Sequence, residues 1–276
     1  MSSQKKPVLH RSTDVPRDPF QKRREMTWHE QLVWLLHLGA AMEHSLMAQY
    51  LYAGYSLGGP LVPREHHIKV KGWQDSILAV AREEMGHLLT VQNVLTFLGA
   101  GFNLSRDQFP WPIEWFNIEP FCMGSLACYV NAEMPENEKF DEREEIEKLV
   151  AKHLGKNTPP VHPVAEIYRQ VMELLADSNR IPESALHPES YSMQASWDEW
   201  GRGYKPDPRP LDAAGNLEPT AEARSKAQFD SHVLVFKVAT RTEAIAALKQ
   251  VSLQGEGKED MKEVGVWTHF RRFIQI

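Results

Sequence analysis

Apolar residues recur at steps of three and four along much of the chain, a spacing that predicts helices with one core-facing side. Two of these helices begin with the spacing of a capping box, Thr27 with Glu30 and Thr240 with Glu243. Glycine and proline mark the points where the pattern stops. The four long helices expected from the pattern cover residues 27–57, 73–98, 163–176 and 240–254.

The segments between these helices carry weaker patterns. A loop-rich stretch covers 109–135 and contains a short apolar helix over 123–134. Residues 179–230 are rich in Pro, Gly and Trp and predict a long irregular excursion. The run 232–238 fits a short strand, and 266–274 fit a further helical turn or two. The chain therefore predicts an all-α fold, a four-helix bundle with long loop excursions.

Composition narrows the class of protein. With 276 residues, of which 42% are apolar, the chain can bury a full core. We expect a flexible N-terminal segment over 1–26 and one bundle domain over 27–276. The net charge of -6 arises from basic and acidic residues spread through the chain, which leaves no basic face for nucleic acid. The polar N-terminus lacks the apolar core of a signal peptide, and no apolar run reaches the roughly 18 residues of a membrane span.

These features predict a cytoplasmic protein without a nucleic acid or membrane partner. Its cysteines, Cys122 and Cys128, could form one bridge at most. In a reducing compartment two packed, free thiols are the expected state.

The candidate functional residues are polar residues that interrupt the apolar stripes of the helices. Glu43 occupies the middle of the core-facing stripe of the first long helix. On the second helix Glu84 and His87 share the inward face as Glu-x-x-His, a motif that aims both side chains at one point and recurs in di-iron bundles. A buried carboxylate needs a positive partner. An ion pair with Arg82 would satisfy that need, but inward carboxylates on two successive helices favour a metal site as strongly.

Two further glutamates fit ordinary roles. Glu83, beside Glu84, and Glu133, before Pro135, are expected to form hydrogen bonds or to face solvent.

Several short strings occur in an order that resembles a known family. They are residues 42–53 (MEHSLMAQYLYA), 81–88 (AREEMGHL), 164–169 (VAEIYR), 253–257 (LQGEG) and 268–273 (THFRRF). In this order they resemble the ferritin-like family. They are similar in particular to the ferritin-like domain of the iminophenyl-pyruvate dimer synthases of violacein-type bisindole biosynthesis.

The resemblance implies a ferritin-like bundle and a set of metal ligands. Four carboxylates and two imidazoles suit two iron ions, with manganese open as an alternative. Helical spacing places the apolar stripe of the third helix nearly opposite Glu166, so this residue rests on the resemblance alone. The implied ligands are Glu43, Glu84, His87, Glu166, Glu256 and His269.

The last two of these ligands are separated by twelve residues. A continuous helix would place Glu256 and His269 about 20 Å apart, so the chain has to loop out and return for both to reach one site.

The expected function is a non-haem dimetal oxidase or oxygenase, with two iron ions, that acts with dioxygen on a small amino-acid-derived substrate. No catalytic residue beyond the ligands is indicated, and formation of a homo-oligomer is left open. The alternative is a non-catalytic metal-binding or interaction protein with a ferritin-like bundle. The long loops favour the enzyme, because long loops on a rigid scaffold often form pockets.

Overall fold

The structure of the chain is a computed structural model. It describes residues 25–106, 116–135, 140–155, 163–200, 233–256 and 268–276. The N-terminal segment expected over 1–26 lies outside the described residues, apart from its last two positions.

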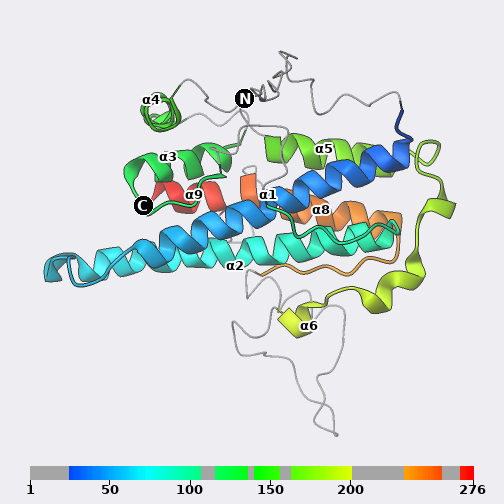
Figure 1. Cartoon of the computed structure of the whole chain (residues 1–276), viewed down its shortest axis with the longest axis horizontal. Coiled ribbons are helices and arrows are strands. Elements are labelled where there is room, and N and C mark those ends of the chain that lie inside the picture. The colour runs from blue at the N-terminus through cyan, green and yellow to red at the C-terminus, as the bar shows by residue number, and fades with distance from the viewer. Residues whose placement is uncertain (1–24, 107–115, 136–139, 156–162, 201–232, 257–267) are drawn as a thin grey trace, which may run out of the picture.

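Two long helices are the central elements of the fold. α1 (Trp28–Ser56) and α2 (His67–Phe97) pack along each other as a hairpin (Figure 1). Thr27 caps α1, and it exchanges with Glu30 the two reciprocal hydrogen bonds of the predicted capping box. α2 begins at His67, a full turn and more before the expected start near Trp73, after the short 3₁₀ helix η1 (64–66).

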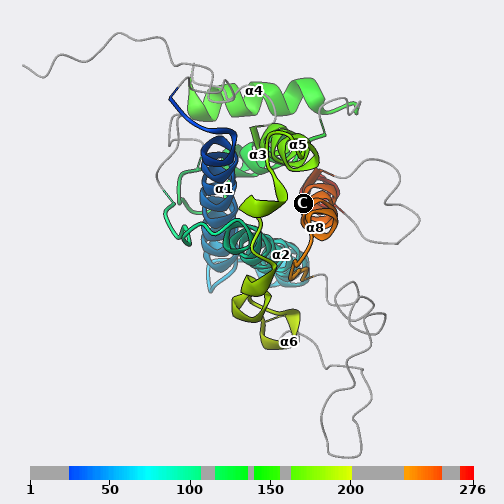
Figure 2. The same ribbon diagram turned by 90° about the vertical axis from the view of Figure 1, so that its right-hand side faces the viewer.

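Two further helices complete a four-helix bundle with one half of this hairpin. α5 (Pro163–Ala176) packs on α1 and on α8 (Arg241–Glu256), and α8 closes the ring against α2. Figures 1 and 2 show α5 and α8 side by side over the same half of the hairpin. The predicted four-helix, all-α architecture is confirmed. The Thr240–Glu243 capping pair is also present.

The other half of the hairpin is covered by shorter helices. α3 (Met123–Ala132) and α9 (His269–Ile274) pack against each other there, and α9 also contacts α2 and α8. In Figures 1 and 2, α3 lies roughly in line with α5, and α9 roughly in line with α8. α4 (Arg143–Leu154) packs on the outer side of α3 and was not predicted from the sequence. The hairpin is therefore faced by two pairs of helices, with a seam between the pairs.

The structure describes residues 179–200 of the excursion expected over 179–230. These residues contain the short helices η3 (Glu183–Ala185), η4 (Pro188–Met193) and α6 (Trp197–Trp200). Residues 107–115 and 201–230, which were expected to form loops, lie outside the described residues.

The strand expected over 232–238 is wrong. Residues 233–238 form irregular backbone that runs along α2, and the described residues contain no strand. Side chains of α2 take the place of a neighbouring strand. The Thr90 hydroxyl donates to Leu234 O and accepts from Phe236 N, and the Asn93 amide donates to Phe236 O. The β-type residues of this run thus pack against a helix instead of a sheet.

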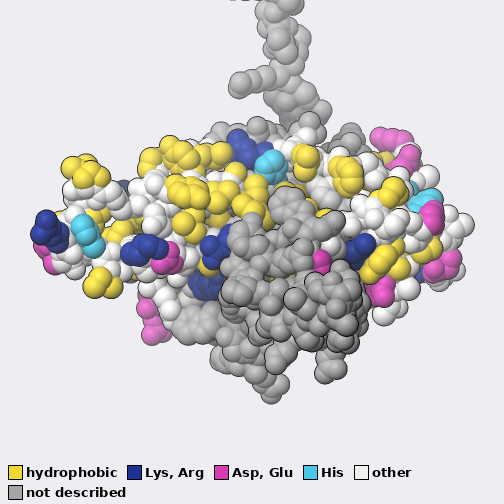
Figure 3. All heavy atoms as spheres, turned by 90° about the horizontal axis from the view of Figure 1, so that it is seen from below, with side chains coloured by type: hydrophobic (Ala, Val, Ile, Leu, Met, Phe, Trp, Pro, Cys, Tyr) yellow, Lys and Arg dark blue, Asp and Glu magenta, His cyan; other side chains and the backbone are white. Residues whose placement is uncertain are grey.

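The described residues bury one main apolar core between α1, α2 and the helices that face them. Among these residues no helix is both long and apolar enough to span a membrane. On the face seen in Figure 3, hydrophobic side chains are interspersed with basic and acidic ones. Cys122 and Cys128 are free thiols, but Cys122 is exposed and not packed as expected.

Candidate metal centre

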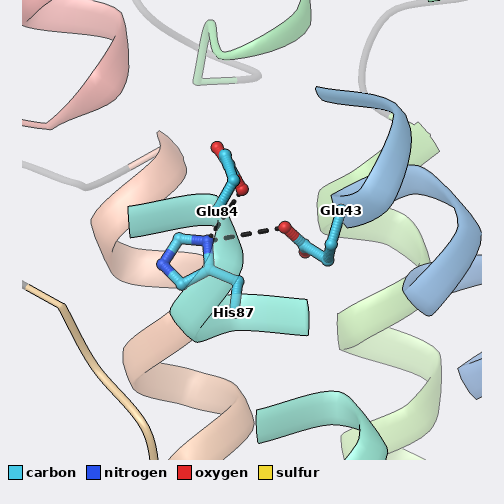
Figure 4. A group of neighbouring side chains, drawn as sticks. All are labelled: Glu43, Glu84 and His87. Carbon is cyan, nitrogen blue, oxygen red and sulfur yellow. Dashed lines mark hydrogen bonds and ion pairs between the residues drawn. The ribbon is translucent and has the colours of Figure 1, made fainter. Parts of the chain in front are cut away.

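The first group of the centre joins α1 and α2 in the middle of the hairpin. Glu43, Glu84 and His87 are each about 2% exposed or less. His87 Nδ1 lies 3.0 Å from Glu84 Oε2 and 3.5 Å from Glu43 Oε2 (Figure 4). The inward aim of Glu-x-x-His, predicted from helical spacing, thus brings both α2 side chains to the carboxylate of α1.

The second group adds residues from the two short helices. Glu133 directly follows α3, and His269 is the first residue of α9, which Thr268 caps. Both are buried, and His269 is fully so. His269 Nδ1 lies 2.8 Å from Glu84 Oε1 and 3.6 Å from Glu133 Oε2. One acceptor or ligand atom from each of Glu84, Glu133 and His269 therefore lies within 4.8 Å of the others.

Glu84 belongs to both groups, and its two oxygens are divided between them. Oε2 faces His87 and Oε1 faces His269. The two imidazole rings are stacked, with their centroids 5.4 Å apart. A carboxylate placed in this way can bridge two cations, while each remaining carboxylate and each imidazole serves one of them.

Every side chain of the centre except Glu84 is held from behind by a hydrogen bond. His87 Nε2 donates to Gln254 Oε1 of α8 at 2.9 Å, and His269 Nε2 donates to Glu83 Oε2 at 2.9 Å. The Tyr168 phenol of α5 donates to Glu43 Oε1. These contacts fix both imidazole rings with Nδ1 toward the carboxylates.

Glu133 is held in the same way. The Tyr50 phenol of α1 donates to Glu133 Oε1 at 2.7 Å, which leaves Oε2 on the side of His269.

The electrostatics are those of a buried anionic site. Burial, followed by the neighbouring Glu84, raises the pKa of Glu43 to about 7. Burial alone would lower the pKa of His87, but Glu84 and Glu43 outweigh it and raise that pKa to about 10. For Glu84, burial favours the neutral form, yet His269 and His87 hold its pKa below the ordinary value. In the metal-free chain the imidazolium rings thus supply the positive charge that these carboxylates require.

The residues fit a pair of metal ions. His269 Nδ1 is fully buried and has no hydrogen bond of acceptable geometry, although it faces two carboxylates. A buried nitrogen in that position is a ready ligand. Oxygen and imidazole donors in these numbers suit iron or manganese.

A small cavity of about 20 Å³ adjoins the centre, between the carboxylates and the side chains of α5 and α8. This volume is enough for a water molecule.

Of the ligands implied by the resemblance, Glu166 is not brought into either group of described residues. The Glu166 carboxylate of α5 accepts hydrogen bonds from Arg169 and Gln170, and Arg169 lowers its pKa. It is about one-third exposed, as helical spacing alone predicted. Glu256 is the last residue of α8, and its side chain lies outside the described residues.

Sequence reasoning missed Glu133 as a member of the centre. The residue lies at the end of a short helix, just before a proline, where no apolar stripe predicts its direction. Glu83 does form hydrogen bonds, which was one of the two roles expected for it, and it is 1% exposed.

Comparison with known proteins identifies the family of this helical chain. The family model described as Ferritin-like matches residues 36–276, which is most of the chain. The chain belongs to the ferritin-like family. Its match begins within α1 and includes both groups of the centre.

Two curated relatives of this ferritin-like chain are enzymes by name. One is dichlorochromopyrrolate synthase of Lentzea aerocolonigenes, 33% identical over 131 residues, which cover 38% of this chain. The other is 2-imino-3-(indol-3-yl)propanoate dimerase of Chromobacterium violaceum, 29% identical over 133 residues, again 38% of this chain. Each match spans only 13% of the relative's own length. No solved structure matches the chain.

Proposed function

We propose that this ferritin-like chain is a non-haem dimetal oxidase or oxygenase that holds two iron ions and acts with dioxygen on a small amino-acid-derived substrate. The observation that carries the proposal is the division of the two Glu84 oxygens between His87 and His269. A structural ion pair needs only one such contact. A buried carboxylate that faces two separate imidazoles suits a pair of cations that share it.

The ligands follow from the two groups. Glu43, Glu84 and His87 would hold one ion, and Glu84, Glu133 and His269 would hold the other. Glu256 stays in the proposal as a further ligand at the end of α8. Its neighbour Gly255 supports this, because a Cβ at Gly255 would lie 3.1 Å from Glu133 Oε2. Glu166 would have to leave Arg169 to join, so we omit it.

Two ferrous ions would supply the electrons for the reduction of dioxygen. The chain's own residues orient the carboxylates and limit the entry of water. The phenols of Tyr168 and Tyr50 donate hydrogen bonds to one oxygen of Glu43 and of Glu133, which keeps the other oxygen of each carboxylate directed to the centre. Leu46 and Val251 line the adjacent cavity and limit the entry of water.

The substrate class rests on the relatives. The dimerase is named for 2-imino-3-(indol-3-yl)propanoate, an imine of an aromatic 2-oxo acid. Since the matched part is 13% of that protein, its whole reaction is not carried over. Imines of aromatic 2-oxo acids, formed from the corresponding amino acids, are nevertheless the first substrates to test.

The test has two stages. Protein loaded with ferrous iron under nitrogen is expected to retain about two irons per chain by elemental analysis. Oxygen uptake is then measured with and without the candidate imines, with Glu84→Ala as the metal-free control. Absence of stoichiometric iron after anaerobic loading would refute the metal centre. Two bound irons without substrate-dependent oxygen uptake would instead favour a non-catalytic metal-binding protein, and loading with manganese would show which metal supports activity.

A further inference from the structure

The imidazole of His269 lies between two consecutive glutamates of α2. Glu84 Oε1 is 2.8 Å from Nδ1 of the ring, and Glu83 Oε2 is 2.9 Å from Nε2. Consecutive residues on a helix point about 100° apart, so both can touch one ring only if the ring enters between them. α9 provides this by placing His269 at its first position, against α2.

The outer contact is a complete ion pair in a buried site. Glu83 is 1% exposed, and its second oxygen accepts from Arg272 Nη1 at 2.7 Å. Arg272 lies one turn after His269 on α9, so both partners of Glu83 come from the same face of that helix. A buried carboxylate with hydrogen bonds to both oxygens stays fixed in place.

The other imidazole is supported differently. His87 Nε2 donates to the amide oxygen of Gln254, a neutral group, whereas His269 Nε2 donates to an ionised carboxylate. A carboxylate behind a ligating histidine fixes its tautomer and makes the metal-facing nitrogen more basic. The two imidazoles of the centre therefore differ in the strength of the hydrogen-bond acceptor behind Nε2.

From these contacts we infer that Glu83 is a positioning residue for the metal ion at Glu84, Glu133 and His269. It keeps the proton of His269 on Nε2, so that Nδ1 is the ligand atom, and strengthens metal binding at that position alone. This inference rests on the proposed dimetal site. The competing role for Glu83 is purely structural, with the ion pair to Arg272 fastening α9 to α2.

Matched variants at the two partners separate these roles. Glu83→Gln keeps an oxygen near His269 Nε2 but removes the charge, and Arg272→Gln removes the ion pair but leaves the carboxylate. Ferrous iron is titrated anaerobically into each metal-free protein by calorimetry, and thermal unfolding is recorded in parallel. Glu83→Gln is expected to weaken one of the two binding events about 10–100-fold and to leave the other unchanged. Arg272→Gln is expected to change the affinity of neither binding event by more than about threefold. Its loss of thermal stability should be comparable to that of Glu83→Gln.

A second measurement uses the wild-type chain. In protein loaded with cobalt and carrying ¹⁵N-histidine, NMR is expected to show His269 bound through Nδ1, with a slowly exchanging Nε2 proton. Coordination through Nε2 would overturn the inference, and so would equal weakening by the two variants or wild-type affinity in Glu83→Gln. Wild-type protein that binds two irons but consumes no oxygen would refute the oxidase and leave the role of Glu83 intact. Wild-type protein that binds no metal would refute both.

Discussion

Among single residues, Glu84 has the largest expected effect on metal content, because both groups of the centre use it. We expect Glu84→Ala to lose both ions and His87→Ala to lose only the ion shared with Glu43. Both variants should stay folded, since neither change touches the apolar stripes of the helices. Metal analysis after anaerobic loading, with circular dichroism for helicity, measures this. Unchanged metal content in a fully helical His87→Ala would show that His87 is not a ligand.

Glu166 gives the opposite prediction. Its carboxylate is paired with Arg169 outside the centre, so Glu166→Ala should keep both ions. A loss of one ion from this variant would show that Glu166 moves to the metal after all, as the family resemblance implies.

Metal binding should release protons at neutral pH. Glu84 and Glu43 overcome the effect of burial and raise the pKa of His87 to about 10, so metal has to displace a proton from Nδ1. Affinity is therefore expected to rise with pH between about 6 and 9. Without metal, the free energy of unfolding has the opposite pH dependence and falls as pH rises. The pKa of His87 lies above its ordinary 6.5, so the stability from its ion pair with Glu84 is complete below pH 6.5 and lost as pH rises through about 10.

The measurement is calorimetry of metal binding in two buffers with different ionisation enthalpies. Heat that does not depend on the buffer would contradict proton release.

The residues of the centre were not equally predictable. Helical periodicity alone indicated Glu43, Glu84 and His87, because all three interrupt long apolar stripes. His269 required the family resemblance, since its helix has only six residues. Glu133 depends on how α3 docks, a tertiary contact that no local pattern contains.

At the scale of elements, the bounds of helices were predicted correctly where the capping residues and the apolar stripe indicate the same helix. α5 has the predicted bounds, and α1 and α8 begin at their predicted capping boxes. The strand prediction for 233–238 failed because the β-type residues of this run pack on α2. Side chains of α2 form the hydrogen bonds to its backbone that a neighbouring strand would form. α4 has a weak apolar stripe with a single buried residue, Val150, and its highly charged sequence gave no signal.

That contact between the irregular segment and α2 gives an element-scale prediction. A Cβ at Gly86 would lie 2.5 Å from Leu234 O, so the helix and the segment touch through a position without a side chain. Gly86→Ala is expected to lower the free energy of unfolding by about 1–3 kcal/mol through this overpacking. Gly72→Ala is the matched control on the same helix. It meets open space, and it should raise stability by roughly 0.5–1 kcal/mol.

Urea unfolding of both variants without metal measures the difference. If the two substitutions changed stability equally, the close approach at Gly86 would not be an energetic constraint.

At the scale of the whole molecule, the centre lies at the seam between two pairs of helices that face the α1–α2 hairpin. The residues of the two groups come from α1, α2, α9 and the position after α3, whereas α5 and α8 contribute supporting hydrogen bonds. Four separate segments must therefore be in place at once. Bound metal would link the short helices to the hairpin in a way that the apolar core alone does not.

Hydrogen exchange with and without metal should reveal this link. A ligand that binds only the closed arrangement stabilises it by RT ln(1 + [L]/Kd), about 2.7 kcal/mol at 100 times Kd. Amides of α9 and α3 that open without global unfolding should then exchange up to roughly 100-fold more slowly in the metal-loaded protein. α4 packs on α3 but carries no residue of either group, so its exchange should change little.

Glu84→Ala, which lacks both ions, should show no difference on addition of metal. Equal protection of α4 and α9 would mean that metal stabilises the molecule only globally. Exchange in α9 that does not respond to metal, in a protein that binds two ions, would show that His269 is not held by either ion. Because α9 also contacts α2 through Glu83, the response of Glu83→Gln adds a further distinction. Its α9 should exchange faster than wild type without metal and recover only part of the protection when metal is added.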